Sequence, residues 1–260
     1  MSQSLYIAAS GALVQQMRLE VLANNLSNSN TAGFKEDKSI FRAYLPGSSA
    51  PSINNSEEFV NGGEQRIETS ALSGNFCVTF EGTKTNFSPG QLKYTGNALD
   101  LALNGSGFFC VATPAGIQYT RNGNFTLNKE GVLVTQEGLP VVGSRGDIRI
   151  GNQDFIVDGK GAVIVDKNQI DGIKIVDFPQ PNSLQKIGDT LFKPIDPTNT
   201  GKEAEESEIM QGFIEFSNVD SIKVITEMIE VLRAYESYQK VIQSVDDVTS
   251  KAINEVGKVT

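Results

Sequence analysis

The segment VITEMIEVLRAYESYQKVIQSVDDVTSKAINEV, residues 224–256, decides the fold of this chain. Its apolar residues recur at alternating spacings of four and three, without a proline and without a glycine. The pattern predicts one helix from about Val219 to Val256, roughly 57 Å long at the usual rise per residue. Asp220 or Asn218 can cap its start. The predicted stripe consists of Val224, Met228, Val231, Tyr235, Tyr238, Ile242, Val245, Thr249, Ala252 and Val256.

Three further apolar residues, Ile225, Ile229 and Leu232, widen the stripe in the first half of this helix. They predict that this half is buried on more than one side. A helix of this length cannot fold back into a small domain, so it needs a second long helix as a partner.

The N-terminal segment from about Ser4 to Leu26 is the other long helix that the sequence predicts. Its heptad positions are mostly leucine and alanine, so a partner helix can approach closely. Gln16 interrupts the pattern once, and the Asn-rich stretch 24–33 ends the helix because Asn and Gly favour left-handed caps and turns. The predicted seam consists of Leu5, Ala12, Leu19 and Leu26, with Ala9 and Ala23 between them.

The middle of the chain has the character of an all-β domain. Dipeptides such as Asn104-Gly105 and Asn122-Gly123 separate short β-branched runs at close intervals, and residues 119–127 read as strand, turn and strand. We therefore predict an α+β fold, in which the terminal helices pair as a coiled coil around an inserted all-β domain. The expected parts are residues 1–35 (helix and Asn-rich motif), 36–64 (extended linker), 65–212 (β domain) and 213–260 (long helix).

Composition argues against several classes of function. The formal net charge of −9 disfavours nucleic acid as a partner, and the absence of histidine excludes His-dependent catalysis and His-ligated zinc. No apolar run reaches the ~18 residues that a membrane-spanning helix needs. The first basic residue is Arg18, so a cleaved signal peptide is not expected. Cys77 and Cys110 lie in apolar runs and are expected to be buried thiols.

The stretches that resemble known ligand-binding motifs are incomplete. The Gly105-Ser106-Gly107 stretch begins like a dinucleotide loop, but Cys110 stands where the third glycine belongs. Residues 166–172 resemble a calcium loop only at the first two ligand positions. We expect no catalytic, metal or cofactor site, no small-molecule substrate, and therefore a protein that is not an enzyme.

The heptad stripe of the long helix allows two interpretations. It can bury itself in a helical hairpin within one chain, or it can also pack between subunits. Tyr235 and Tyr238 favour the second interpretation, since tyrosine is enriched at interfaces. Periodicity alone does not separate the two.

Three stretches give the chain a resemblance to a known family. Residues 23–28 (ANNLSN) with 31–35 (TAGFK), residues 100–109 (DLALNGSGFF) with 119–125 (YTRNGNF), and residues 228–236 (MIEVLRAYE) resemble the flagellar rod and hook proteins. They keep the family's order and are spread over nearly the whole chain.

The resemblance implies a structural subunit of the bacterial flagellar basal-body rod, which crosses the periplasm. It implies export by the flagellar type III machinery without a cleaved signal, and assembly with itself and with other rod proteins. It further implies that the terminal helices line an inner tube and that the β domain faces outward. The matched motifs add to the expected subunit interface Ala23, Asn24, Asn25, Leu26, Thr31, Gly33, Phe34, Arg233 and Ala234.

Within the family, the run from Tyr94 to Asp100 resembles the proximal-rod subunits most closely. The chain is also short for a hook protein, which carries an extra outer domain. A distal-rod subunit is the alternative within the family. From a different class, a secreted glycan-binding or glycan-cleaving β domain with oligomerising ends stays open.

Overall fold

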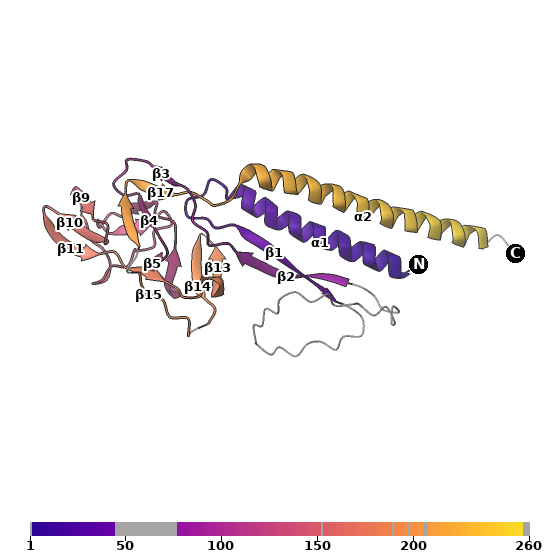
Figure 1. The fold of residues 1–260 in the computed structure, drawn as a ribbon, viewed down its shortest axis with the longest axis horizontal. Coiled ribbons are helices and arrows are strands. Elements are labelled where there is room, and N and C mark those ends of the chain that lie inside the picture. The colour runs from indigo at the N-terminus through magenta and orange to yellow at the C-terminus, as the bar shows by residue number, and fades with distance from the viewer. Residues whose placement is uncertain are drawn as a thin grey trace, which may run out of the picture. The chain divides into compact units, whose positions relative to one another are not determined.

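The computed structural model describes residues 2–44, 77–151, 153–188, 190–196, 198–204 and 207–256. The fold is α+β, as predicted: one long helix near each end of the chain and a strand-rich region between them (Figure 1). Most of the predicted linker, residues 45–64, and the first part of the predicted β domain, residues 65–76, lie outside the described residues.

The two helices begin and end close to the predicted residues. Helix α1 spans Ser2–Ser27 and helix α2 spans Ser221–Val256. Asp220 caps α2, because its Oδ1 accepts the backbone N–H groups of Ile222 (3.0 Å) and Lys223 (3.1 Å). Of the two predicted caps, Asp220 therefore fills the position.

The chain divides into two compact units that do not follow the chain order. One comprises Met1–Leu22, Ser39–Thr83 and Ile225–Thr260, and the other comprises Ala23–Lys38 and Lys84–Val224. Helix α1 therefore begins in the first of these units and ends in the second, whereas helix α2 begins in the second and ends in the first. The boundaries expected at residues 35, 64 and 212 stay predictions of domain organisation.

The first unit, the helical unit, contains most of α1 and α2 and most of a two-stranded sheet. Strand β1 spans Asp37–Tyr44 and pairs with β2, Cys77–Thr85. Across this sheet Arg42 Nη2 lies 2.7 Å from Glu81 Oε1. The stretch after residue 36, expected to be an extended linker, thus begins as a paired strand.

The second unit, the strand unit, contains short strands that form several small sheets and one larger one. The larger sheet has six strands in the order β13-β14-β6-β5-β12-β15, a second sheet has the order β11-β10-β9, and the pairs are β16-β4, β17-β3 and β7-β8. The described strands are β3 Leu92–Tyr94, β4 Leu101–Asn104, β5 Phe108–Thr113, β6 Gly116–Thr120, β7 Phe125–Leu127, β8 Leu133–Thr135, β9 Phe155–Val157, β10 Ala162–Val165, β11 Asn168–Gly172, β12 Ile175–Asp177, β13 Leu184–Gly188, β14 Leu191–Pro194, β15 Lys202–Glu203, β16 Glu208–Gln211 and β17 Phe213–Glu215. A short 3₁₀ turn, Pro181–Ser183, precedes β13.

The two strands predicted within residues 119–127 are present as the end of β6 and as β7, but they do not pair with each other. β6 pairs with β5 and β14, whereas β7 pairs with β8. The residues between them bond elsewhere, since Leu101 N–H donates to Gly123 O at 2.9 Å. β5 directly precedes β6 and β8 directly follows β7 along the chain, so the Asn-Gly stretch between β6 and β7 is not the turn of a hairpin.

The core of the strand unit lies on both faces of β5, whose consecutive residues are buried in two different clusters. One cluster includes Phe109, Leu133 and Val163, and a second gathers around Phe108 and Phe192. Cys110 is a buried free thiol in the second cluster, and burial raises its pKa to about 12, so it stays neutral near pH 7. The side chain of Cys77 lies outside the described residues.

Candidate functional site

The stripe predicted along α2 is the side of that helix with the least exposure to solvent. Val224 and Val231 are buried, while Arg233 is exposed and Ala234 is half-buried. The heptad pattern thus identifies the face of α2 that packs; its use between subunits stays a prediction. The stripe continues through half-buried side chains: Met228, Tyr235, Tyr238, Ile242, Val245, Thr249 and Ala252.

The seam on α1 is only partly the predicted one. Ala12 is buried, and Leu5, Leu19 and Leu26 are half-buried. Ala9 and Ala23 are exposed, so they are not part of the seam that packs within this chain. The buried residues between the seam leucines are Ala8 and Leu22, which lie three residues after Leu5 and Leu19, respectively. The prediction places these intermediate positions one residue later.

The two helices meet at a glycine. A Cβ atom added to Gly11 would lie 2.5 Å from Cε1 of Tyr238, so the tyrosine ring packs directly on the backbone of α1. Only glycine leaves room for a ring at this position. The contact lies within one chain, and Tyr238 therefore serves an intramolecular pairing whatever it does between subunits.

The Asn-rich motif after α1 is held inside the strand unit by side-chain hydrogen bonds. The Nδ2 of Asn25 donates to the carbonyl of Asp37 at 2.7 Å, and its Oδ1 accepts the N–H of Asp37 at 2.9 Å. Thr31 Oγ1 bonds Asn28 Oδ1 at 3.2 Å, and Asn24 O accepts the N–H of Asn28 at 3.1 Å. These bonds fix the path of the chain as it leaves α1.

Gly33 and Phe34 are buried in this motif. Gly33 has a φ of 67°, and its N–H donates to Glu215 O at 2.8 Å. A Cβ at this position would lie 2.3 Å from the backbone nitrogen of Asn122. Phe34 is covered by the ammonium group of Lys186, 3.9 Å from the ring centroid. In the isolated chain Asn25, Gly33 and Phe34, expected at a subunit interface, are thus internal packing residues.

The most unusual feature of the strand unit is a buried cluster of charges, which we call the ion triad: Lys35, Arg121 and Glu215. Lys35 Nζ lies 2.6 Å from Glu215 Oε1. Arg121 Nε lies 2.9 Å from Glu215 Oε2, and this contact is an ion pair whose geometry is not that of a hydrogen bond. The side chains of Lys35 and Glu215 are 1% exposed, and that of Arg121 is 5% exposed. Charges at this depth are stable only when they are paired and hydrogen-bonded.

The remaining donors and acceptors of the ion triad are bonded mainly to the backbone. Lys35 Nζ also donates to Ser88 O at 2.8 Å, and Gly90 N–H donates to Glu215 Oε1 at 2.9 Å. Burial lowers the pKa values of Lys35 and Arg121, while the carboxylate of Glu215 acts in the opposite direction.

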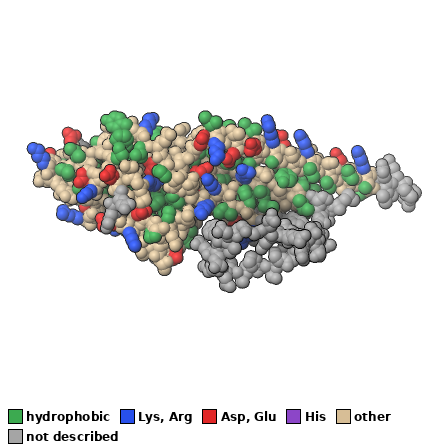
Figure 2. All heavy atoms as spheres, viewed as in Figure 1, with side chains coloured by type: hydrophobic (Ala, Val, Ile, Leu, Met, Phe, Trp, Pro, Cys, Tyr) green, Lys and Arg blue, Asp and Glu red, His purple; other side chains and the backbone are tan. Residues whose placement is uncertain are grey.

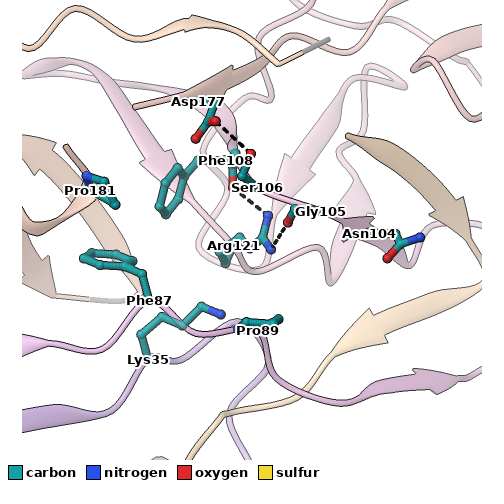
Figure 3. Close-up of a pocket in the computed structure, with 11 residues that line it drawn as sticks. Lys35, Phe87, Pro89, Asn104, Gly105, Ser106, Phe108, Arg121, Asp177 and Pro181 are labelled. Carbon is teal, nitrogen blue, oxygen red and sulfur yellow. Dashed lines mark hydrogen bonds between the residues drawn. The ribbon is translucent and has the colours of Figure 1, made fainter. Parts of the chain in front are cut away.

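Arg121 also explains the glycine-rich loop that began like a dinucleotide site. Its Nη1 donates to Gly107 O at 2.7 Å and its Nη2 to Gly105 O at 2.6 Å, as Figure 3 shows for the surrounding cavity of about 410 Å³. Ser106 Oγ on the same loop bonds Asp177 Oδ2 at 2.7 Å. The backbone carbonyl groups of this loop therefore bind the guanidinium group of an arginine from the same chain.

A second set of bonds joins the segment ahead of α2 to the N-terminal motif. Asn218 Oδ1 accepts the N–H of Glu36 at 2.7 Å, and its Nδ2 donates to Asn86 O (2.9 Å) and Ser88 O (3.0 Å). Lys186 Nζ donates to Lys35 O at 2.8 Å and to Asp37 Oδ2 at 2.7 Å. Together with the ion triad, these contacts tie residues 23–38, 84–90, 121 and 213–218 into one junction.

This junction was not found from the sequence. Lys35 and Arg121 stand in the motifs that carry the family resemblance, but nothing in their spacing pointed to a shared partner. Glu215 offered one signal, because it is a lone carboxylate in the apolar run Phe213-Ile214-Glu215-Phe216. Such a residue is rarely buried without a partner.

The described residues contain no group of three His, Cys, Asp or Glu side chains that could hold a metal ion. No helix in the part of the chain that the structure describes is long and apolar enough to cross a membrane.

Comparisons with known proteins find one family along the chain. Three family models match in chain order: a flagella basal body rod protein model at residues 5–35, a flagellar hook protein FlgE/F/G D1 domain at residues 102–170, and a flagellar basal body rod FlgEFG protein C-terminal model at residues 210–255. The chain is 34% identical to the flagellar basal-body rod protein FlgF of Caulobacter vibrioides, with all of both chains covered. It is 33% identical to the rod protein FlgG of Bacillus subtilis over 98% of this chain and 99% of that one. It is 31% identical to the hook-basal body complex protein FlhO of the same organism, again over the whole of both chains.

Proposed function

This chain belongs to the flagellar basal-body rod proteins, and we propose that it is the proximal-rod subunit, rod protein F, which polymerises through its terminal helices. As a structural subunit of the basal-body rod, it forms part of the axial shaft. The observation that carries the proximal assignment is the match to FlgF, which extends over the full length of both chains. Distal-rod protein G is the alternative, since the identity to FlgG is 33% against 34% for FlgF.

The proposed coiled coil of α1 and α2 is supported by the close approach of Gly11 and Tyr238. It is supported further by the stripe on α2, whose packed face continues at spacings of three and four from Val224 to Ala252. An isolated helix of this kind gains stability mainly by packing its apolar face. Pairing within the chain and packing between chains can use the same helices, as bundles with a wide apolar face do.

We place the helices around the inner channel of the rod and the strand unit outside it. The relatives are structural rod proteins, which gives the alternative of a secreted glycan-binding or glycan-cleaving β domain no support. Passage through the flagellar type III export machinery follows from this role, because the rod lies beyond the cytoplasmic membrane. The partners are then further copies of this chain and the neighbouring rod proteins.

The test is a deletion of the gene in the source bacterium, complemented by a tagged copy. Loss of motility, and basal bodies whose proximal rod is incomplete, would show that the chain is needed below the level of the distal rod. Labelling of the tag in isolated basal bodies should then mark the proximal rod. Basal bodies with a complete proximal rod but no distal rod, rescued by the tagged copy, would instead assign the chain to the distal position.

A further inference from the structure

Helix α1 carries unusually few charges for a helix with an exposed surface. Over Ser2–Ser27 the charged residues are Arg18 and Glu20 alone. Its large apolar side chains are nevertheless partly in solvent, with Tyr6 58% and Leu13 51% exposed. Exposed apolar side chains that lie together on one side of a helix mark a surface that a neighbour can cover.

The exposed side of α1 forms one wall of an apolar groove within the helical unit. The other wall is strand β2, and the groove has a volume of about 410 Å³. In Figure 2 several lysine and arginine side chains project from the edge of the molecule that α2 occupies. The groove is lined by Tyr6, Ala9, Ser10, Leu13, Val14, Met17, Val78 and Phe80, none of which is charged.

Helix α2 carries an apolar row that the described residues leave partly exposed. Ile225, Ile229 and Leu232 are 46%, 47% and 41% exposed, although the sequence predicted them to be buried. They lie roughly a third of a turn around the helix from the stripe that packs. Their spacing of four and three is that of the anchors with which a helix enters a hydrophobic groove.

We propose that the row Ile225, Ile229 and Leu232 of one copy occupies the α1–β2 groove of a second copy. The inference rests on the proposed function and specifies the contact through which the helices of neighbouring subunits join. Row and groove are different surfaces of the same chain, so the contact is head-to-tail and repeats from subunit to subunit, as a helical tube requires. The groove lining and the three residues of the row are uncharged, and a charged occupant of the groove would have to lose its hydration against an apolar wall without compensation.

The contact can be tested by cysteine crosslinking in assembled basal bodies. Two differently tagged full-length copies are produced together in the deletion strain, one with Leu13→Cys and the other with Ile229→Cys. Both copies also carry Cys77→Ser. Cys110 does not need to be replaced, because its buried, neutral thiol is not expected to form a disulfide. Ile253→Cys in place of Ile229→Cys is the control, since Ile253 is exposed but outside the row.

We expect an oxidised dimer that carries both tags with Leu13→Cys and Ile229→Cys, and none with the control. A second pair, Tyr6→Cys with Ile225→Cys, serves if a first-pair variant fails to assemble. Basal bodies that contain both tags but give no dimer with either pair, or give as much with Ile253→Cys, overturn the groove contact and leave the rod function intact. A crosslink from Leu13→Cys to a different rod protein overturns the choice of a second copy. Absence of the unsubstituted tagged chain from basal bodies would instead refute the proposed function itself.

Discussion

The helical unit and the strand unit use their apolar residues in opposite ways. In the strand unit Phe109, Leu133 and Val163 are fully enclosed, and even the buried charges have partners in the same unit. In the helical unit large side chains such as Leu13 and Ile229 stay half in solvent. A unit that covers its own core is stable alone, whereas a unit that exposes apolar rows needs neighbours. The contrast predicts which changes damage the subunit and which damage only its assembly.

The largest effect on the subunit is expected from Glu215→Ala. The change leaves Lys35 and Arg121 as two buried cations without a carboxylate, and loss of one partner of a buried ion pair costs about 3–5 kcal/mol. The free energy of unfolding, measured in urea by tyrosine fluorescence and circular dichroism, should fall by that amount. Glu208→Ala on β16, the preceding strand along the chain, is the matched control, because Glu208 is exposed. If both variants unfold alike, the ion triad is not what holds the strand unit together.

Val231→Asp should leave the strand unit intact and abolish assembly. Val231 is buried on the stripe of α2, and an unpaired charge at such a position costs several kcal/mol. Incorporation into basal bodies and motility should be lost, while the urea midpoint of the strand unit stays unchanged. Gln239→Asp, an exposed position of the same helix, should be tolerated. Motile cells with normal rods carrying Val231→Asp would contradict the idea that this stripe is essential.

Gly33→Ala tests where the division between the units falls. Gly33 follows the first helix in sequence but has a left-handed backbone and touches Asn122 in the strand unit. Alanine there should destabilise the strand unit by about 1–3 kcal/mol, because it adds both backbone strain and a clash. Gly159→Ala, with open space and no positive φ, should change the free energy of unfolding by less than about 0.5 kcal/mol. Equal effects would show that residue 33 is not part of the strand unit.

The sequence predicted well what depends on local periodicity. The spacings of three and four gave both helices and the packed face of α2, since that face is set by one helix alone. They did not give the intermediate seam of α1, because small residues stand at both candidate positions, Ala8 and Ala9. The spacings also did not predict that Ile225, Ile229 and Leu232 stay exposed. Periodicity shows that a face of a helix is apolar, but it does not show what covers that face.

The sequence could not predict what depends on distant partners. The ion triad joins Lys35, Arg121 and Glu215, which lie 86 or more positions apart (121 − 35 = 86). No spacing rule connects them, and their chemistry becomes visible only when the fold brings them together. The strands expected within 119–127 are present as the end of β6 and as β7, but which strands they pair with depends on the rest of each sheet.

The smallest effect is expected at the point where the strand unit passes into α2. Asp220→Ala removes the side-chain oxygen that accepts the N–H groups of Ile222 and Lys223, and loss of such a cap costs about 0.5–2 kcal/mol. The cost should be confined to the first turn of α2, because the ion triad and the Asn218 bonds do not involve Asp220. Amide exchange of Ile222 and Lys223 should therefore speed up while exchange in β5 and β12 stays unchanged. Asp246→Ala, an exposed position within α2, is the control. If Asp220→Ala also accelerates exchange in β5, the start of α2 supports the strand core, and the strand unit is less self-sufficient than its burial pattern indicates.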